Sequence, residues 1–416
     1  MPTTKQNPGA AIKQKTRLHD HLVFLAGTIG ERPTGSERNR QAAQYIGETL
    51  SGLRYDMEFQ NFPIGEWNAA RVQLTCGDLE LHAEANPYSP ACNCTAELVT
   101  AGTLSELETA DITGKILLAH NELTKEYLMP RNFRFYHHDE HCRIVQLMEE
   151  KKAAAVITVC PRSDQPVHVI IDGDFPVPSC TVTAPEGAVL LKNAGKQVLL
   201  RIDATTMPAV AANVIGRSGD RSGKKIVLCA HFDTKFSTPG ALDNATGAAV
   251  LLELARVFHE QPVTTGLEFV FFNGEECYCA PGECAYLDAG YLIPARVLLG
   301  INVDGAGLAG SPVGISWYGC PDILVADTQK FQAQYPGIDP MDPWPQGDHM
   351  IFFMHQIPCI AISTKADPAV IARIIHSEND TLEGLDEEKI QAVIDLTERI
   401  IRQVAGTSKI YFKNIS

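Results

Sequence analysis

The sequence predicts an α/β fold: a three-layer domain with a mixed, mostly parallel sheet flanked by helices, interrupted by an inserted β-rich module. Two observations carry this prediction. From Lys224 onward, short apolar strands alternate with longer segments of helical periodicity, which is typical of an α/β sheet. Residues 67–208 instead hold short strand-like runs between turns rich in Pro, Gly and Asp. We therefore expect one domain formed by residues 1–66 and 209–416 and a second formed by 67–208, a division that 416 residues allow.

The expected elements of the first domain follow from periodicity. A helix should begin after Ser36, because Ala42, Ile46 and Leu50 recur at helical spacing. Apolar positions predict two further helices, over 248–258 and 387–404, and Asn244 or Thr246 can cap the first of them. Short apolar runs predict four buried strands, at 226–230, 267–272, 297–303 and 359–363. In the inserted module, strands are expected at 116–119, 155–159 and 198–202.

Composition excludes some classes of partner. The formal net charge of −15 argues against a nucleic-acid partner, since such binding needs a concentrated basic surface. The chain has no run of about 18 apolar residues, so we expect no membrane span. Twelve cysteines without a regular framework are typical of free thiols in a reducing compartment. With no recognisable signal peptide, we expect a cytoplasmic location, or a secreted one if a leader was removed. The sequence does not predict the oligomeric state.

Polar side chains follow the predicted strands where each strand ends. His231 and Asp233 follow the first strand, and the remaining strands are followed by Glu275 and Glu276, by Asp304, and by His376. In an open α/β sheet, ligand sites form outside the carboxyl ends of the strands. Singly, each residue has a plainer interpretation: a histidine satisfied by its neighbour, a solvated loop tip, a turn former or a surface histidine. Their convergence in type and position favours a functional site.

These residue types suit one chemistry. Imidazole and carboxylate groups bind zinc at about 2.0–2.2 Å. Two zinc ions about 3.5–4 Å apart clamp the attacking and leaving oxygens of a displacement, and a bridging carboxylate is needed between them. Asp243 lies just before the predicted helix at 248–258, where backbone N–H groups can steady its charge. An adjacent carboxylate that does not bind metal can take a proton from a water molecule that bridges the two ions.

At this point the chain resembles the co-catalytic dizinc exopeptidases, a family that includes bacterial aminopeptidases, glutamate carboxypeptidase and the catalytically silent transferrin receptor. The resemblance is carried, in family order, by residues 229–233, 240–247, 271–276, 302–304 and 376–381. It implies one zinc ion bound by His231, Asp243 and Asp304. It implies a second bound by Asp243, Glu276 and His376, with Asp243 bridging.

The resemblance also implies roles for neighbouring residues. Glu275 matches the general base that acts on a metal-bridging water, and Asp233 would orient His231. Asp380 would act on the loop of His376. The implied reaction is removal of N-terminal residues from a peptide substrate with a free N-terminus. The segment with Asp348 and His349 matches one that borders the substrate pocket of the family.

Two departures from the family pattern concern that pocket. Trp344 stands where the family often has a tyrosine that donates to the oxyanion, and an indole N–H is a donor of different reach. The stretch after Glu276 is one residue longer than usual and contains Glu283. The inserted module resembles a protease-associated domain through residues 112–119 and 152–157.

Three alternatives stay open. A carboxypeptidase, dipeptidase or N-deacylase would use the same centre, and a carboxypeptidase needs grouped arginines, for which Arg296 and Arg373 are not obviously placed. A receptor-like homologue without catalysis would have substituted ligands. Finally, His137, His138 and His141 form a cluster in which His137 and His141 have i, i+4 spacing, which can chelate zinc. The simpler interpretation of that cluster is an exposed, charged helix start.

Overall fold

The computed structural model describes residues 17–135, 138–160, 167–219 and 223–412. The chain divides into two compact units. The first comprises Met1–Ile64, Val210–Glu276 and Ala280–Ser416, and the second comprises Gly65–Ala209 and Cys277–Cys279. The junctions fall after residues 64 and 209, where the sequence suggested 66 and 208.

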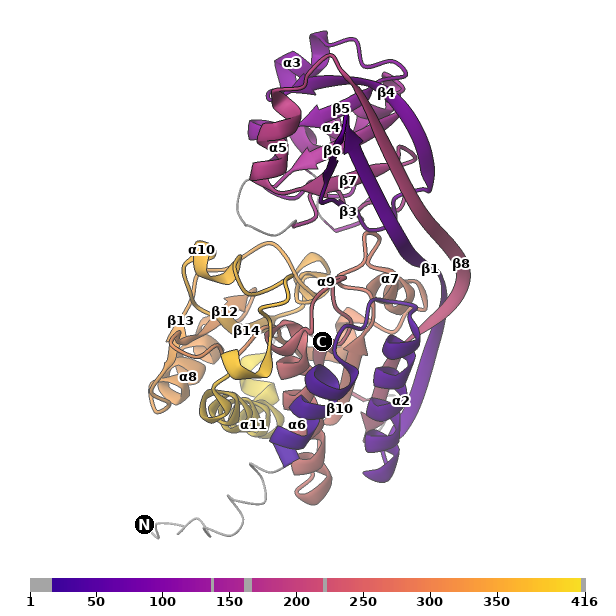
Figure 1. The fold of residues 1–416 in the computed structure, drawn as a ribbon. Coiled ribbons are helices and arrows are strands. Elements are labelled where there is room, and N and C mark those ends of the chain that lie inside the picture. Colours follow the sequence, from indigo (N-terminus) through magenta and orange to yellow (C-terminus); the bar gives the residue numbers. More distant parts are fainter. Residues whose placement is uncertain (1–16, 136–137, 161–166, 220–222, 413–416) are drawn as a thin grey trace. The chain divides into compact units, whose positions relative to one another are not determined.

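The sheet of the first unit is mixed and largely parallel (Figure 1). Its strand order is β13-β12-β14-β11-β9-β10-β8. The pairs β14–β11, β11–β9 and β9–β10 are parallel, whereas β12–β14 and β10–β8 are antiparallel. The predicted fold class is confirmed. The strand bounds are β8 Gln197–Ser218, β9 Lys225–His231, β10 Gly266–Phe272, β11 Val297–Val303, β12 Val313–Tyr318, β13 Ile338–Pro340 and β14 Cys359–Thr364.

Both faces of this sheet are buried, as expected for parallel strands. On one face, alternate residues such as Leu228 and Ile301 join a core that α6 and α11 complete. On the other face, Phe272 packs edge-on against Tyr286 of α7. The helices are η1 Val23–Ile29, α2 Glu37–Gly52, η3 Ala241–Ala245, α6 Thr246–Glu260, α7 Pro281–Asp288, η4 Pro294–Arg296, α8 Asp322–Gln332, α9 Met350–Met354, α10 Pro368–Ile371, η5 Leu382–Gly384 and α11 Glu387–Tyr411.

Capping and burial explain the main helices. The Ser36 side chain accepts from the backbone N–H of Asn39 at the start of α2. The N-cap residue of α6 is Ala245, not Asn244 or Thr246 as predicted; Asn244, one position earlier, still accepts through Oδ1 from the N–H of Gly247 at 2.9 Å. In α11 the predicted apolar stripe is fully buried, and each such side chain contributes about 1.5–3 kcal/mol; it consists of Ile390, Val393, Ile394, Leu396 and Ile400.

The second unit has its own sheet and core. Strands β4, β5, β6 and β7 are mutually parallel, with β3 and the first part of β8 antiparallel at the two edges. Helices accompany the strands, and Leu117, Val156 and Met148 lie in the core. The bounds are β1 Asp56–Cys76, β2 Leu79–Leu81, β3 Glu84–Ala85, β4 Cys92–Ala101, α3 Leu104–Thr109, β5 Ile116–Ala119, η2 Asn121–Thr124, α4 Asp139–Glu150, β6 Ala155–Val159, β7 Ser179–Val182 and α5 Ala184–Leu191.

Two general features complete the description. All twelve cysteines lie in described residues, and no two of them form a disulfide there. Across the described ranges, no helix combines the length and apolar character needed to cross a bilayer.

Candidate metal centre

Three neighbouring parallel strands deliver most of the candidate site. His231 is the last residue of β9, Glu275 and Glu276 follow β10, and Asp304 directly follows β11. Because β10, β9 and β11 are adjacent and parallel, the loops at their carboxyl ends meet at one edge. Asp243 comes from η3, immediately before α6, and His376 comes from the segment after α10.

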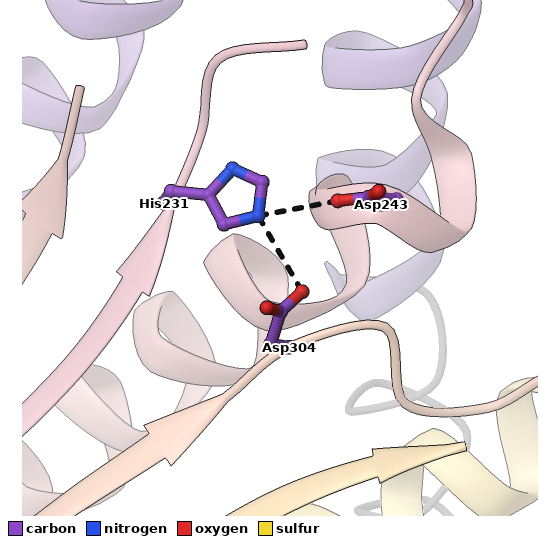
Figure 2. Close-up of side chains that lie close together, drawn as sticks. All are labelled: His231, Asp243 and Asp304. Atoms are coloured by element: carbon purple, nitrogen blue, oxygen red, sulfur yellow. Dashed lines mark ion pairs between the residues drawn. The ribbon is translucent and has the colours of Figure 1, made fainter. Parts of the chain in front are cut away.

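Asp243 lies at the middle of the site. Its Oδ1 is 3.2 Å from His231 Nε2, and its Oδ2 is 3.1 Å from His376 Nε2. His231 Nε2 is also 3.4 Å from Asp304 Oδ1, and Figure 2 marks both ion pairs of His231 with dashed lines. His376 Nε2 is 2.8 Å from Glu276 Oε1. The two oxygens of one carboxylate therefore face two different histidines.

The side chains form two groups that share Asp243. His231, Asp243 and Asp304 offer ligand atoms that all lie within 4.8 Å of one another, and so do Asp243, Glu276 and His376. Each group has one imidazole and two carboxylates, the N/O donor set that zinc accepts, with three protein ligands as in catalytic sites. In the part of the chain that the structure describes, no further group of this kind occurs.

The burial of these carboxylates favours a nearby cation. His231 is 1 %, Asp243 8 % and Glu276 5 % exposed. Burying several carboxylates together is costly unless positive charge accompanies them. Lys235 supplies one such charge, with Nζ 2.7 Å from Glu276 Oε2. The surplus of carboxylates fits the presence of bound divalent cations.

The backbone at His376 is strained. Its φ is +58°, in the left-handed region that a residue with a Cβ rarely adopts. Such conformations persist where the surroundings enforce them, and they gather at functional sites. This conformation is consistent with a histidine held for binding.

Asp233 contacts the far side of His231. The Nδ1 of His231 lies 3.5 Å from Asp233 Oδ1 and 3.3 Å from the Asp233 carbonyl oxygen. Asp233 Oδ2 accepts from Thr34 Oγ1 at 3.0 Å and from the Glu276 N–H at 3.2 Å. A contact to the second ring nitrogen fixes the orientation of a metal-binding imidazole, which is the role expected of Asp233.

Glu275 belongs to neither ligand group. It is half-buried, and burial raises the pKa of Glu275 well above its usual value. His231 opposes this shift, whereas Glu276 and Asp304 add to it. The side chain is therefore within electrostatic reach of both groups.

The three candidate substrate residues lie together beside an unpredicted tyrosine. The Trp344 ring packs edge-on against His349 at 4.8 Å and against Tyr318 at 6.1 Å. Tyr318 Oη donates to the Trp344 carbonyl and accepts from its N–H, and His349 Nε2 lies 3.0 Å from the same carbonyl. Trp344 is thus anchored through its backbone. Burial lowers the pKa of His349 to about 4, so its ring is neutral.

Asp348 is buried near another carboxyl group. It is 1 % and Glu283 is 3 % exposed, and the negative charge of Glu283 adds to the rise in the pKa of Asp348 that burial causes. Among the described residues, neither Asp348 oxygen nor Glu283 Oε2 has an N–H or O–H donor. Burial raises the pKa of Glu283 to about 7 and that of Asp348 well above its usual value. Two carboxyl groups can form a hydrogen bond with each other only when one of them carries a proton.

Sequence reasoning missed the contact of Lys235 and the partners of Asp380. Lys235 follows His231 by four positions, and only its charge could have suggested a role. Asp380 was expected to act on the His376 loop, to which it belongs. Its two oxygens accept from the N–H groups of Leu242 and Asp243 at 2.6 and 3.0 Å, and its own N–H donates to the Ser377 carbonyl. Asp380 therefore joins the loop after His376 to the turn of Asp243.

The histidine cluster of the second unit is only partly described. His137 lies outside the described residues. Helix α4 begins at Asp139, with His138 as its N-cap residue. His138 and His141 stack at 3.7 Å.

Comparison with known proteins decides the family. A family model described as "Peptidase family M28" matches residues 213–401, which contain both ligand groups. The chain belongs to peptidase family M28. A peptidase is a hydrolase, so this M28 peptidase is an enzyme that hydrolyses peptide bonds.

Alignments with known relatives cover nearly the whole chain of this M28 peptidase. Aminopeptidase YwaD of Bacillus subtilis is 24% identical, covering 98% of this chain and 91% of its own. A zinc aminopeptidase structure from Bacillus subtilis has a TM-score of 0.76 at 21% identity, covering 94% of each chain. An aminopeptidase from Aneurinibacillus sp. strain AM-1 has a TM-score of 0.71 at 24% identity, covering 94% of this chain and 93% of its own. The solved structures share the fold.

Proposed function

We propose that this M28 peptidase is a zinc-dependent aminopeptidase with a two-ion centre. The observation that carries the proposal is the placement of the Asp243 carboxylate, whose two oxygens face His231 and His376 separately. His231, Asp243 and Asp304 would hold one ion, and Asp243, Glu276 and His376 the other. When bound, the ions act as Lewis acids that lower the pKa of water and polarise a peptide carbonyl.

The residues around the ligands supply the proton chemistry. Glu275 follows β10 beside both groups without belonging to either. We assign it the role of general base, which takes a proton from the attacking water and delivers it to the leaving amine. Asp233 holds His231, and Asp380 holds the backbone of Asp243.

Cleavage at the N-terminus is the finer part of the proposal. It is supported by the names of relatives, which include an aminopeptidase and a zinc aminopeptidase. Of the two arginines considered for a carboxypeptidase, Arg296 directly precedes β11, whereas Asp304 follows that strand. A seven-residue strand is about 23 Å long, so Arg296 is at the wrong end of the sheet. The carboxypeptidase alternative is left with Arg373.

A matched peptide set tests the proposal. One peptide would be incubated with zinc-loaded protein in free, N-acetylated and C-amidated forms, and the products followed by mass spectrometry. We expect stepwise loss of N-terminal residues that acetylation abolishes and amidation does not affect. Cleavage that survives acetylation but requires a free carboxyl end would instead establish a carboxypeptidase. No cleavage of any form would contradict the peptide substrate, and the Glu275→Gln protein controls for contaminating peptidases.

A further inference from the structure

A buried arginine of the N-terminal segment contacts the loops that carry the candidate metal ligands. Arg32 is 0 % exposed. It precedes α2 and lies about 200 residues away in sequence from the first proposed ligand. None of the roles assigned above involves it.

The guanidinium of Arg32 donates only to backbone carbonyls. Nε donates to Phe232 at 2.5 Å, and Nη2 donates to Gly240 at 2.8 Å. Nη1 donates to Gly30 and Pro239, both at 2.8 Å, and to Leu25 at 3.2 Å. A planar group with five donors fixes several carbonyls in one geometry, which a lysine cannot reproduce.

Three of the five carbonyls that Arg32 binds, those of Phe232, Pro239 and Gly240, belong to the ligand loops. Phe232 stands between His231 and Asp233, so its peptide sets the direction of both side chains. Pro239 and Gly240 begin the turn that presents Asp243. Gly240 has φ +63°, and a Cβ there would lie 2.2 Å from Thr234 Cγ2. This close packing leaves the turn little freedom once the guanidinium is in place.

Charge gives a second reason for an arginine at this position. Burial lowers the pKa of Arg32 to about 10, while Asp380, Asp233 and Asp243 oppose the shift. The group therefore stays charged at neutral pH. It supplies positive charge beneath the carboxylates without neutralising any ligand by direct contact.

Two further side chains of the same segment contact the remaining loops. Thr34 Oγ1 donates to Asp233 Oδ2 at 3.0 Å. The Asn39 and Asn273 amides exchange two hydrogen bonds of 2.9 Å each, and Asn273 precedes Gly274 and Glu275. The segment from Arg32 to Asn39 thus reaches the loops after β9 and β10 and the turn of Asp243.

We propose that Arg32 is a positioning residue for the metal centre: it holds the loops of His231 and Asp243 in the geometry that binds metal. The inference rests on the function proposed above. It predicts that Arg32 controls metal affinity, and not only the stability of the fold.

The test compares Arg32→Lys with a matched control. Arg217 is another largely buried arginine of the first unit, bound to Glu58 and Glu268. Zinc dissociation constants of the wild type, Arg32→Lys and Arg217→Lys would be measured by competition with a chromophoric chelator. Urea unfolding of each metal-free protein would report stability. We expect Arg32→Lys to weaken zinc binding about 10–100-fold, the range typical of residues that support metal ligands, and Arg217→Lys to bind like the wild type.

Each outcome decides one question. A folded Arg32→Lys protein with wild-type zinc affinity would overturn the positioning role, whatever its stability. Equal weakening in both variants, in proportion to lost stability, would also overturn it. Arg32→Gln serves as a second variant if Arg32→Lys does not fold, because its amide can still donate to one or two of the same carbonyls, and unchanged zinc affinity there would overturn the inference. A wild type that binds no zinc would instead overturn the proposed function, and this inference with it.

Discussion

Histidine and carboxylate side chains gather in two regions of this protein, one in each unit. In the first unit, the metal centre draws His231, Asp243, Glu276, Asp304 and His376 from five separate segments. In the second unit, His138 and His141 are three residues apart at the start of α4. Both regions contain histidine and carboxylate side chains, but the ring nitrogens of the histidines have different contacts in the two regions.

In the second region, the Nδ1 atom of each of these two histidines accepts a hydrogen bond from the local backbone. His138 Nδ1 accepts from the N–H of His141 as a helix cap. His141 Nδ1 accepts from the N–H of Met129 at 3.2 Å, and its Nε2 is 3.7 Å from Glu126 Oε1. In the metal centre, Nε2 of each histidine faces two carboxylates that come from different, distant segments. Sequence proximity of histidines therefore says less about metal binding than convergence of distant ones.

The largest effect is expected at the shared carboxylate. Asp243→Asn removes the charge that both ligand groups use, so we expect kcat/KM to fall about 10⁴-fold. Zinc content after dialysis, measured by mass spectrometry of the metal, should fall below the wild-type level. Glu126→Gln changes the carboxylate beside His141 and is the matched control. Full activity of the Asp243→Asn protein would contradict the centre.

A smaller loss is expected at the proposed base. Glu275→Gln keeps the shape of the side chain but cannot accept a proton, so kcat should fall about 10²–10⁴-fold. Zinc binding should stay at the wild-type level, because Glu275 is in neither ligand group. Steady-state kinetics at measured zinc occupancy checks this. Near-wild-type turnover would show that another group carries the proton.

Acid should destabilise the protein through His349. Its folded pKa is about 4 against 6.5 for the unfolded chain. Well above pH 6.5, the His349 imidazole is neutral in both the folded and the unfolded protein. Below it only the unfolded state binds the proton, so stability falls as the pH falls toward 4. The loss reaches about 3 kcal/mol.

Urea unfolding of wild type and His349→Gln at pH 7 and pH 4.5 measures this contribution. We expect the variant to lose less stability between the two pH values, since glutamine can still donate to the Trp344 carbonyl but does not titrate. Burial also lowers the pKa of His141, so some acid sensitivity should persist in the variant. An identical pH dependence of both proteins would show that His349 does not contribute.

The smallest effect is expected in the second region. His141→Asn preserves an acceptor near the N–H of Met129, so we expect a loss of about 1 kcal/mol or less in the free energy of unfolding. Zinc content and KM should match the wild type. A drop in either would make this cluster a functional site and remove the contrast between the two regions.

The sequence predicted what depends on local pattern. Strand positions followed from apolar runs, and the side chains at their carboxyl ends were identified by type. The structure brings His231, Asp243, Glu276, Asp304 and His376 together, as the sequence led us to expect. The β1 strand was missed because Pro63, Gly65 and several polar residues interrupt its alternation.

Contacts between distant segments were beyond sequence reasoning. The bonds of Arg32 to Phe232, Pro239 and Gly240 join residues 200 to 208 positions apart. No periodicity marks such a residue, and an arginine before a helix is ordinarily a surface side chain. The partners of Asp380 on the turn of Asp243 were missed for the same reason. The cytoplasmic location and the protease-associated character of the second unit stay predictions.

The long sequence separation between Arg32 and its partners also constrains the order in which the protein folds. Its partners are synthesised some 200 residues after it, and Asp380 follows later still. During translation, water solvates the guanidinium until these acceptor carbonyls have been synthesised. In that time the whole second unit emerges and folds, since domains fold as units. Contacts of such long sequence separation form slowly because their loop-closure entropy comes first. The ligand loops can reach their final geometry only late in folding, after nearly the entire chain has left the ribosome.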